Sequence, residues 1–271
     1  MMKKWGTLTL CLMLAGSLLA GCGDKNKDEA AAPDNGATNA SAKTLVLGTS
    51  ADFPPYEFHK MIDGKDQIVG FDIEIAKEIA KDMGAKLEVK DMDFKALLGE
   101  LSSGRVDFVI SGMTPDEERK KAIDFSNNYY KAEQAVVVRE KDKDKYTTMQ
   151  SLEGVSFGIQ TGSIQEDIAK TIPKAKITGL GKINDIIMQL NSGRVDASIM
   201  EKPVAEAFLK NVKGLAIADA VPDYKEDGYA IGVKKGNTEM VEQINKTLDR
   251  LNSEKKIEQF VSEASDLAAQ K

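Results

Sequence analysis

The spacing of apolar residues changes repeatedly along the chain after residue 43. Over Phe71–Met83, apolar residues recur every three to four positions, which predicts an amphipathic helix that ends at Gly84. Val106–Ile110 is a short run of strand-forming residues, the pattern of a strand buried on both faces. The same criteria predict strands at 44–47, 86–89, 156–159, 175–178, 195–200 and 229–233, and helices at 94–101, 164–171, 183–191, 240–251 and 256–264.

The order strand, helix, strand, helix, strand occurs twice in this pattern. The segments LSSGRVDFVI (101–110) and LNSGRVDASI (190–199) also share Ser-Gly-Arg-Val-Asp between apolar flanks. The alternative is that the five-residue match is a coincidence, but the equal element order favours two related units. Alternating strands and helices predict parallel sheets with right-handed crossovers, and therefore two α/β lobes. Ligands are expected at the carboxyl ends of such strands.

The turn that follows Val106–Ile110 has the features of an anion site. Thr114 suits a helix N-cap, Pro115 suits the first helical position, and Glu117 completes a capping box. Arg119 lies one turn further on, so its planar guanidinium can grip a carboxylate beside the free N–H groups of the helix start. Alternatively, Arg119 is an ordinary surface charge in a charged run.

The first 21 residues have the pattern of a bacterial targeting segment. Lys3 and Lys4 precede an apolar core, Trp5–Ala20, which is too short for a confident membrane span. Leu19-Ala20-Gly21-Cys22 matches the lipobox, in which the cysteine receives a diacylglyceryl group and acyl chains such as palmitate; a chance match is the alternative. Residues 22–43 are poor in large apolar residues, which predicts a flexible tether. We expect a protein anchored by lipid to the extracellular face of the cell membrane.

Composition excludes several classes of protein. Removal of residues 1–21 takes away two lysines, so the formal charge goes from −6 to −8, which argues against a nucleic-acid partner. Cys22 is then the only cysteine, which leaves no disulfide framework, no thiol metal site and no catalytic thiol beyond the lipidation site. Asp52–Tyr56 is predicted to be a loop stiffened by Pro54 and Pro55. The single histidine, His59, is placed in the loop Phe58-His59-Lys60 and is interpreted as solvated. We expect no cofactor and no metal.

Three segments resemble a known family. GFDIEIAKEI (70–79), SGMT (111–114) with its following arginine, and DFSNNYY (124–130) are similar to the polar amino-acid branch of the bacterial extracellular solute-binding proteins of family 3. The resemblance runs from about Leu45 to the C-terminus. It implies a fold like the type II periplasmic binding proteins, with two parallel-sheet α/β lobes joined by a two-crossover hinge. Residues 44–133 plus 226–271 would form lobe 1, and 134–225 lobe 2.

The resemblance also implies partners for each group of a free amino acid. Arg119, with the backbone around Thr114 and the N–H groups of Ser163 or Ile164, would hold the α-carboxylate. Glu201, with the Gly112 carbonyl and the Thr114 hydroxyl, would hold the α-ammonium. The ligand side chain would lie between two aromatic rings and meet polar groups; the residues concerned are Phe53, Phe94, Ser50, Asp52, Ser111 and Gln160, with Gln165 as a further candidate. Alternatively, Ser163 is only a cap, Phe94 is core and Glu201 is solvated.

The predicted function is that of a receptor for an ABC importer, and not an enzyme. The segments GTSADFPPYEF and GIQTGSIQED look most like arginine-type binders of Gram-positive bacteria. The ligand would be arginine or another cationic or polar amino acid, with glutamine as the alternative and an enzyme on the same fold as a weaker one. Its partners would be the permease subunits and the membrane, and we expect a monomer. A sensory domain would require a transmembrane span after the binding lobes.

Overall fold

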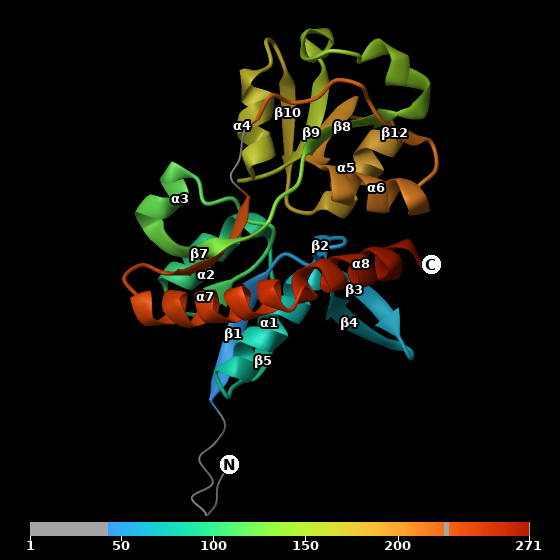
Figure 1. Cartoon of the computed structure of the whole chain (residues 1–271). Coiled ribbons are helices and arrows are strands. Elements are labelled where there is room, and N and C mark those ends of the chain that lie inside the picture. The colour runs from blue at the N-terminus through green and yellow to red at the C-terminus, as the bar shows by residue number, and fades with distance from the viewer. Residues whose placement is uncertain (1–42, 225–227, 271) are drawn as a thin grey trace, which may run out of the picture. The chain divides into compact units, whose positions relative to one another are not determined.

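The computed structural model describes residues 43–224 and 228–270, so the targeting segment and almost all of the predicted tether lie outside the described residues. Within them the chain forms two five-stranded sheets and one small three-stranded sheet, with helices packed around them (Figure 1). No helix of the described ranges is long and apolar enough to cross a membrane. The described residues also hold no group of three or more metal-ligating side chains.

The first sheet has the order β5-β1-β6-β13-β7. Strand β1 pairs in parallel with β5 and β6, whereas β13 is antiparallel to β6 and β7. Helices α1 and α2 form the crossovers between the parallel strands. The elements are β1 (Thr44–Thr49), α1 (Phe71–Asp82), β5 (Lys86–Asp91), the 3-10 turn η1 (Phe94–Ala96), α2 (Leu97–Ser102), β6 (Phe108–Val109), β7 (Ile123–Tyr130) and β13 (Tyr229–Lys234).

The second sheet has the order β10-β9-β11-β8-β12 and repeats this plan. Strand β9 pairs in parallel with β10 and β11, and β8 is antiparallel to β11 and β12. Its elements are β8 (Gln134–Arg139), the 3-10 turns η2 (Glu140–Lys145) and η3 (Met149–Leu152), β9 (Ser156–Gln160), α4 (Ile164–Thr171), β10 (Lys176–Leu180), α5 (Ile183–Asn191), β11 (Ala197–Glu201), α6 (Lys202–Asn211) and β12 (Leu215–Ile217).

The predicted fold class, two α/β lobes built on repeated strand-helix units, is confirmed. The sheets are mixed, however, because strands β7, β8, β12 and β13 add antiparallel partners to each parallel core. These four strands flank the two connections between the sheets, at 131–133 and 218–228. Strands β8 and β13 each follow one of these connections and enter a new sheet without a crossover helix. An antiparallel orientation is therefore open to them, because only parallel neighbours require a crossover.

Two local predictions were wrong. The segment Asp52–Tyr56 is not only a loop, because β2 (Asp52–Phe53) pairs with β3 (Glu57–Ile62), which pairs in turn with β4 (Lys65–Val69). Helix α3 (Glu117–Ala122) begins after Asp116 and not after Thr114. The carboxylate of Asp116 accepts a hydrogen bond from the backbone N–H of Arg119 at 2.8 Å, so the aspartate takes the capping role predicted for the threonine.

The last two helices, α7 (Thr238–Ser253) and α8 (Lys256–Ala269), lie against α1 (Figure 1). Helix α8 also packs on α6, and the side-chain amide of Asn211 donates to the carbonyl of Ala268 at 2.9 Å. The C-terminal segment therefore touches helices of both lobes.

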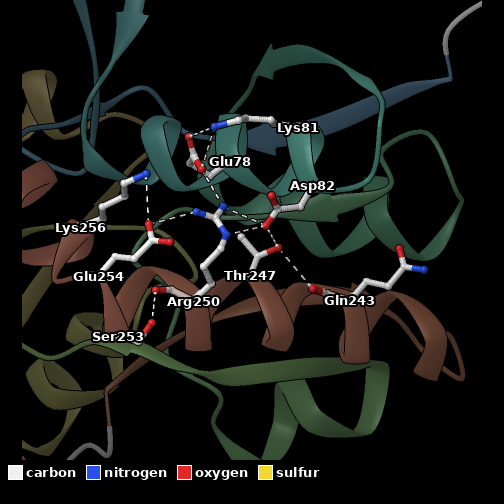
Figure 2. Close-up of polar contacts among 9 residues, drawn as sticks. All are labelled: Glu78, Lys81, Asp82, Gln243, Thr247, Arg250, Ser253, Glu254 and Lys256. Atoms are coloured by element: carbon white, nitrogen blue, oxygen red, sulfur yellow. Dashed lines mark hydrogen bonds and ion pairs between the residues drawn. The ribbon is translucent and has the colours of Figure 1, made fainter.

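Arg250 links α7 to α1 through a cluster of charges (Figure 2). Its guanidinium donates to Glu78 at 2.6 Å and to Asp82 at 2.8 Å, and it reaches Glu254 on the turn before α8 at 3.3 Å. The hydrogen bond from Arg250 lowers the pKa of Glu78 below its usual value of 4.5. One side chain of α7 thus holds three acidic groups, two from α1 and one from the turn before α8.

We expect Arg250→Ala to lower the free energy of unfolding by about 1–2 kcal/mol, because several charge-assisted hydrogen bonds are lost at a half-exposed site. Since the pKa of Glu78 is depressed in the folded protein, this contribution is complete above Glu78's usual pKa and disappears as the pH falls through the depressed value. Urea unfolding at two pH values measures both effects. Lys170→Ala, which removes an exposed pair, is the control; an equal loss there would contradict the role of Arg250.

Candidate ligand-binding site

A narrow cavity of about 310 Å³, including the space at its mouth, lies where turns of the two lobes meet. Most of its lining comes from the carboxyl ends of strands β1, β6, β9 and β11 and the residues that follow them. The lining residues are Ser50, Phe53, Glu57, Phe94, Ser111, Gly112, Thr114, Arg119, Gln160, Ser163, Ile164, Gln165 and Glu201. Every residue predicted as a ligand contact is in this set except Asp52, and the structure adds Glu57, which the sequence analysis missed.

Arg119 is buried in the wall of the cavity, with 8% of its surface exposed, so it is not an ordinary surface charge. Its guanidinium donates to the carbonyl of Thr114 at 2.8 Å and to the carbonyl of Gly162 at 3.0 Å. It lies 5.5 Å from the ring centroid of Phe94, and its Nε is 3.2 Å from a carboxylate oxygen of Asp116. Burial lowers the pKa of Arg119, but an arginine keeps its charge in proteins. One cation therefore joins residues of both lobes.

Glu201 stands at the end of β11, the strand that follows the second Ser-Gly-Arg-Val-Asp segment. It is buried, with 3% exposure, so the alternative of a solvated glutamate is wrong. The amide nitrogen of Gln165 donates to Glu201 at 2.9 Å and to Gln134 at 2.9 Å. This places a carboxylate with a fixed orientation in the cavity wall.

Ser163 is the N-cap of α4, as its sequence position indicates. Its hydroxyl accepts from the backbone N–H of Glu166 at 3.3 Å and donates to the carbonyl of Gln160 at 2.8 Å. The side chain is therefore committed to the cap, and the backbone of Ser163 and Ile164 is the part that remains to face a ligand.

Two buried aromatic rings belong to the lining. Phe53 packs on Tyr56 with ring centroids 5.0 Å apart, and a side chain in place of Gly112 would contact its ring at 3.0 Å. Phe94 belongs to the apolar cluster of Leu97 and Leu101 and also lines the cavity, so it serves the core and the site together. Flat apolar walls of this kind suit a planar polar group.

A second carboxyl group, Glu57, reaches the cavity from the start of β3. It is fully buried, and the hydroxyl of Ser111 donates a hydrogen bond to its Oε1. Behind it, Asp72 of α1 accepts from the backbone N–H of Gly112 at 3.0 Å and from the hydroxyl of Tyr129 at 2.9 Å. Burial raises the pKa of Glu57 well above its usual range and that of Asp72 to about 7.

Asp52 faces away from the cavity. Its Oδ2 accepts a hydrogen bond from the backbone N–H of Ile183, the first residue of α5, and its Oδ1 accepts from the hydroxyl of Ser50 at 3.2 Å. The N-cap residue of α5, Lys182, makes no side-chain cap, so Asp52 caps this helix from the other lobe. Nearby, the ammonium of Lys182 lies 3.0 Å from Asp91. Asp52 thus forms part of a contact between the lobes.

Comparison with known proteins gives the cavity a family context. The sequence profile of the bacterial extracellular solute-binding proteins, family 3, matches residues 45–263. The chain is 37% identical to the arginine-binding extracellular protein ArtP of Bacillus subtilis over 96% of each chain. Its structure is similar to that of the amino-acid ABC transporter substrate-binding protein AbpA of Streptococcus pneumoniae bound to L-arginine, with a TM-score of 0.82, 38% identity, and coverage of 84% of this chain and 97% of that one.

A third similarity concerns an ancestral arginine-binding protein, solved with arginine and with glutamine. Each form gives a TM-score of 0.75 and 39% identity over 81% of this chain, and over 97% and 96% of that protein respectively. These alignments cover nearly as many residues as the structure describes. The chain therefore belongs to the bacterial extracellular solute-binding proteins of family 3, with the two-lobe α/β architecture of type II periplasmic binding proteins.

Proposed function

We propose that this protein is the arginine receptor of an amino-acid ABC importer. The observation that carries the proposal is the set of charges in the cavity, one guanidinium from Arg119 and two carboxyl groups from Glu201 and Glu57. Arginine carries one carboxylate and two cations, so each of its charges meets an opposite partner. A buried charge without a partner is strongly unfavourable, and this matching therefore selects the ligand.

The α-carboxylate is assigned to Arg119. Two of the guanidinium hydrogen bonds go to the carbonyls of Thr114 and Gly162, and the fork has further N–H donors for a ligand. The backbone of Ser163 and Ile164 lines the same end of the cavity. The α-ammonium is assigned to Glu201, with the Gly112 carbonyl and the Thr114 hydroxyl as additional acceptors.

The guanidinium of the ligand is assigned to the space between Phe53 and Phe94, with Glu57 as its counter-ion. Ser50, Ser111 and Gln160 line the cavity and offer further hydrogen bonds. Glu57 takes the role that the sequence analysis gave to Asp52, because the carboxylate of Asp52 is directed to Ile183. Glutamine is the second candidate, since a protonated Glu57 donates a hydrogen bond to an amide as readily as it accepts one when ionised.

Calorimetry with the purified protein tests this assignment. We expect one arginine to bind per chain, with glutamine at least tenfold weaker, and no turnover of either ligand. Arg119→Ala should weaken arginine binding by about 2–5 kcal/mol, since it leaves the ligand carboxylate buried without its partner. Lys121→Ala, an exposed cation on the same helix, is the matched control and should change the affinity little. A change of less than threefold in Arg119→Ala would refute the anchor, and a preference for glutamine would establish the second candidate.

We further propose that the lobes, 44–133 with 226–271 and 134–225, close on the ligand about the two connections. The contact between Asp52 and the start of α5 supports this, because it joins residues of both lobes outside the cavity. The carboxylate of Asp52 caps α5, and the loss of an N-cap destabilises a helix by about 0.5–2 kcal/mol.

Asp52→Ala should therefore weaken arginine and glutamine by the same factor, about three- to tenfold. Asp52→Asn should retain most of the affinity, because its amide oxygen still accepts from Ile183. Asp185→Ala, which removes an exposed acid from the first turn of the same helix, controls for effects on α5 itself. Titration of both ligands against all three variants measures the effect. Selective loss of arginine in Asp52→Ala would show instead that this carboxylate contacts the ligand.

We propose that Cys22 carries the lipid that holds the receptor at the outer face of the membrane, beside its permease partner. The lipobox at 19–22 and the tether at 22–43 support the proposal. Cys22→Ser should release the protein to the medium or leave it unprocessed. Fractionation of cells that express each form gives the answer, with Cys11→Ser as the control within the targeting segment. Membrane retention and normal processing of the Cys22→Ser form would exclude this anchor.

A further inference from the structure

Glu57 and Asp72 form a pair of carboxyl groups at the inner end of the cavity. Glu57 is the first residue of β3, and Asp72 lies in the first turn of α1. Both are fully buried. The two carboxyl groups are close enough for each to shift the pKa of the other, and only Glu57 lines the cavity. The ligand-facing carboxyl group thus has a second carboxyl group directly behind it.

In each carboxyl group of the pair, one oxygen accepts hydrogen bonds and the other has no partner. Glu57 Oε1 accepts from Ser111, and Asp72 Oδ2 accepts from Gly112 and Tyr129. Glu57 Oε2 and Asp72 Oδ1 are buried and have no hydrogen-bond partner. A carboxylate oxygen only accepts hydrogen bonds, so burying both groups as anions would leave two charged acceptors without a donor, which is strongly unfavourable. We therefore expect the pair to hold at least one proton in the ligand-free protein.

Electrostatics lead to the same conclusion. Two adjacent carboxyl groups that are buried cannot both ionise without a compensating charge, which is why such pairs titrate as a unit. Burial is the main cause that raises the pKa of both groups. The neighbouring Asp72 raises the pKa of Glu57 further, whereas Glu57 lowers that of Asp72. The charged or titratable groups around the pair and across the cavity are Asp52 of β2, Tyr56 before β3, Tyr129 of β7, Arg119 of α3 and Glu201 of β11.

We propose that the Glu57–Asp72 pair selects the charge of the ligand side chain, releasing one proton to solvent when a cationic side chain binds against Glu57 and keeping it when a neutral isostere binds. The inference rests on the proposed function, in which Glu57 receives the arginine guanidinium. The carboxyl O–H bond breaks, the proton passes to the buffer, and an N–H group of the guanidinium takes its place as hydrogen-bond donor. Asp72 does not touch the ligand; it is a positioning residue that sets the charge of Glu57.

The direction of the pH dependence follows from this linkage. In the free protein the pair loses a proton near the raised pKa of about 7 of Asp72, and an adjacent guanidinium lowers the pKa of the pair in the complex. Between the two values the complex holds fewer protons than the free protein. Arginine affinity should therefore fall as the pH drops below about 7, by up to tenfold per pH unit, whereas a neutral ligand should show no such fall.

L-citrulline is the matched probe, because it has the shape of arginine with a neutral urea group. We propose titrating the protein with L-arginine and L-citrulline in pairs of buffers that differ in ionisation enthalpy, at about pH 6 and about pH 8.5. The expected result is close to one proton released per arginine near pH 6, falling toward none near pH 8.5, and none released with citrulline at either pH. If arginine binds without proton release, or if citrulline releases as many protons, the inference is overturned while the proposed function stands. If arginine does not bind, both the inference and the proposed function are overturned.

Three variants identify the source of the proton. Asp72→Asn keeps an oxygen for Gly112 and Tyr129 and supplies an amide donor to Glu57, so arginine should bind it with little proton release and a flat pH profile. His59→Gln removes the single histidine and should leave the release unchanged. Asp52→Asn should not abolish the release either, because the carboxylate of Asp52 is directed to the backbone N–H of Ile183 and not to the cavity.

Loss of proton release in His59→Gln or Asp52→Asn, with full release in Asp72→Asn, would assign the proton elsewhere and overturn the inference. If Asp72→Asn does not fold, the comparison of arginine with citrulline on the unaltered protein decides the question alone.

Discussion

The burial of Arg119 is the constraint on which the rest of the site depends. A guanidinium that is almost fully removed from water needs partners on every side, and here they come from one backbone carbonyl in each lobe, a carboxylate and an aromatic ring. The Gly162 carbonyl is available only while the lobes are in contact. In the proposed function this one cation couples ligand binding to closure, because a ligand carboxylate would add a favourable partner that water cannot match in the enclosed cavity.

The fold supplies the other groups through its parallel strands. Ser50, Ser111, Gln160 and Glu201 stand at or just after the carboxyl ends of β1, β6, β9 and β11, two strands from each lobe. Parallel pairing brings these ends to one edge of each sheet, so residues that are far apart in sequence meet around one cavity. The repeat of Ser-Gly-Arg-Val-Asp before β6 and β11 was therefore informative about the fold, whereas most of the individual lining residues were predicted from the resemblance to the family.

The missed residue, Glu57, and the misplaced one, Asp52, depended on strand register, which local sequence does not reveal. In the β2–β3 pairing, Phe53 lies opposite Glu57 and Asp52 lies opposite Phe58. Directly opposite residues share a face and neighbours along a strand alternate, so Phe53 and Glu57 face the cavity together while Asp52 faces the contact between the lobes. The sequence held a partial signal: Asp63 and Gly64, both with positive φ, make the two-residue turn between β3 and β4. Once that hairpin is placed, β2 becomes its third strand and Glu57 points inward.

The helix start at α3 shows the same limit at a smaller scale. Thr114 and Asp116 are both good capping residues, and local preference does not choose between them. Tertiary contacts do, because the carbonyl of Thr114 is required by the guanidinium of Arg119, which holds residues 114 and 115 outside the helix. Sequence patterns thus located the functional turn, and the assignment of roles inside it depended on which groups became buried together.

Closure and selectivity use opposite faces of the same short strand. Asp52 and Phe53 are neighbours in the sequence, yet Asp52 caps α5 of the other lobe while Phe53 lines the cavity together with Glu57. A substitution on the cavity face changes the charge or shape offered to the ligand side chain and leaves the cap in place. The contacts to the α-carboxylate and α-ammonium, which every amino acid shares, come from Arg119 and Glu201 on other elements. In the proposed function, this separation lets a single carboxyl pair distinguish an arginine from a glutamine side chain, because the protonation of the pair can change while the contacts of closure stay the same.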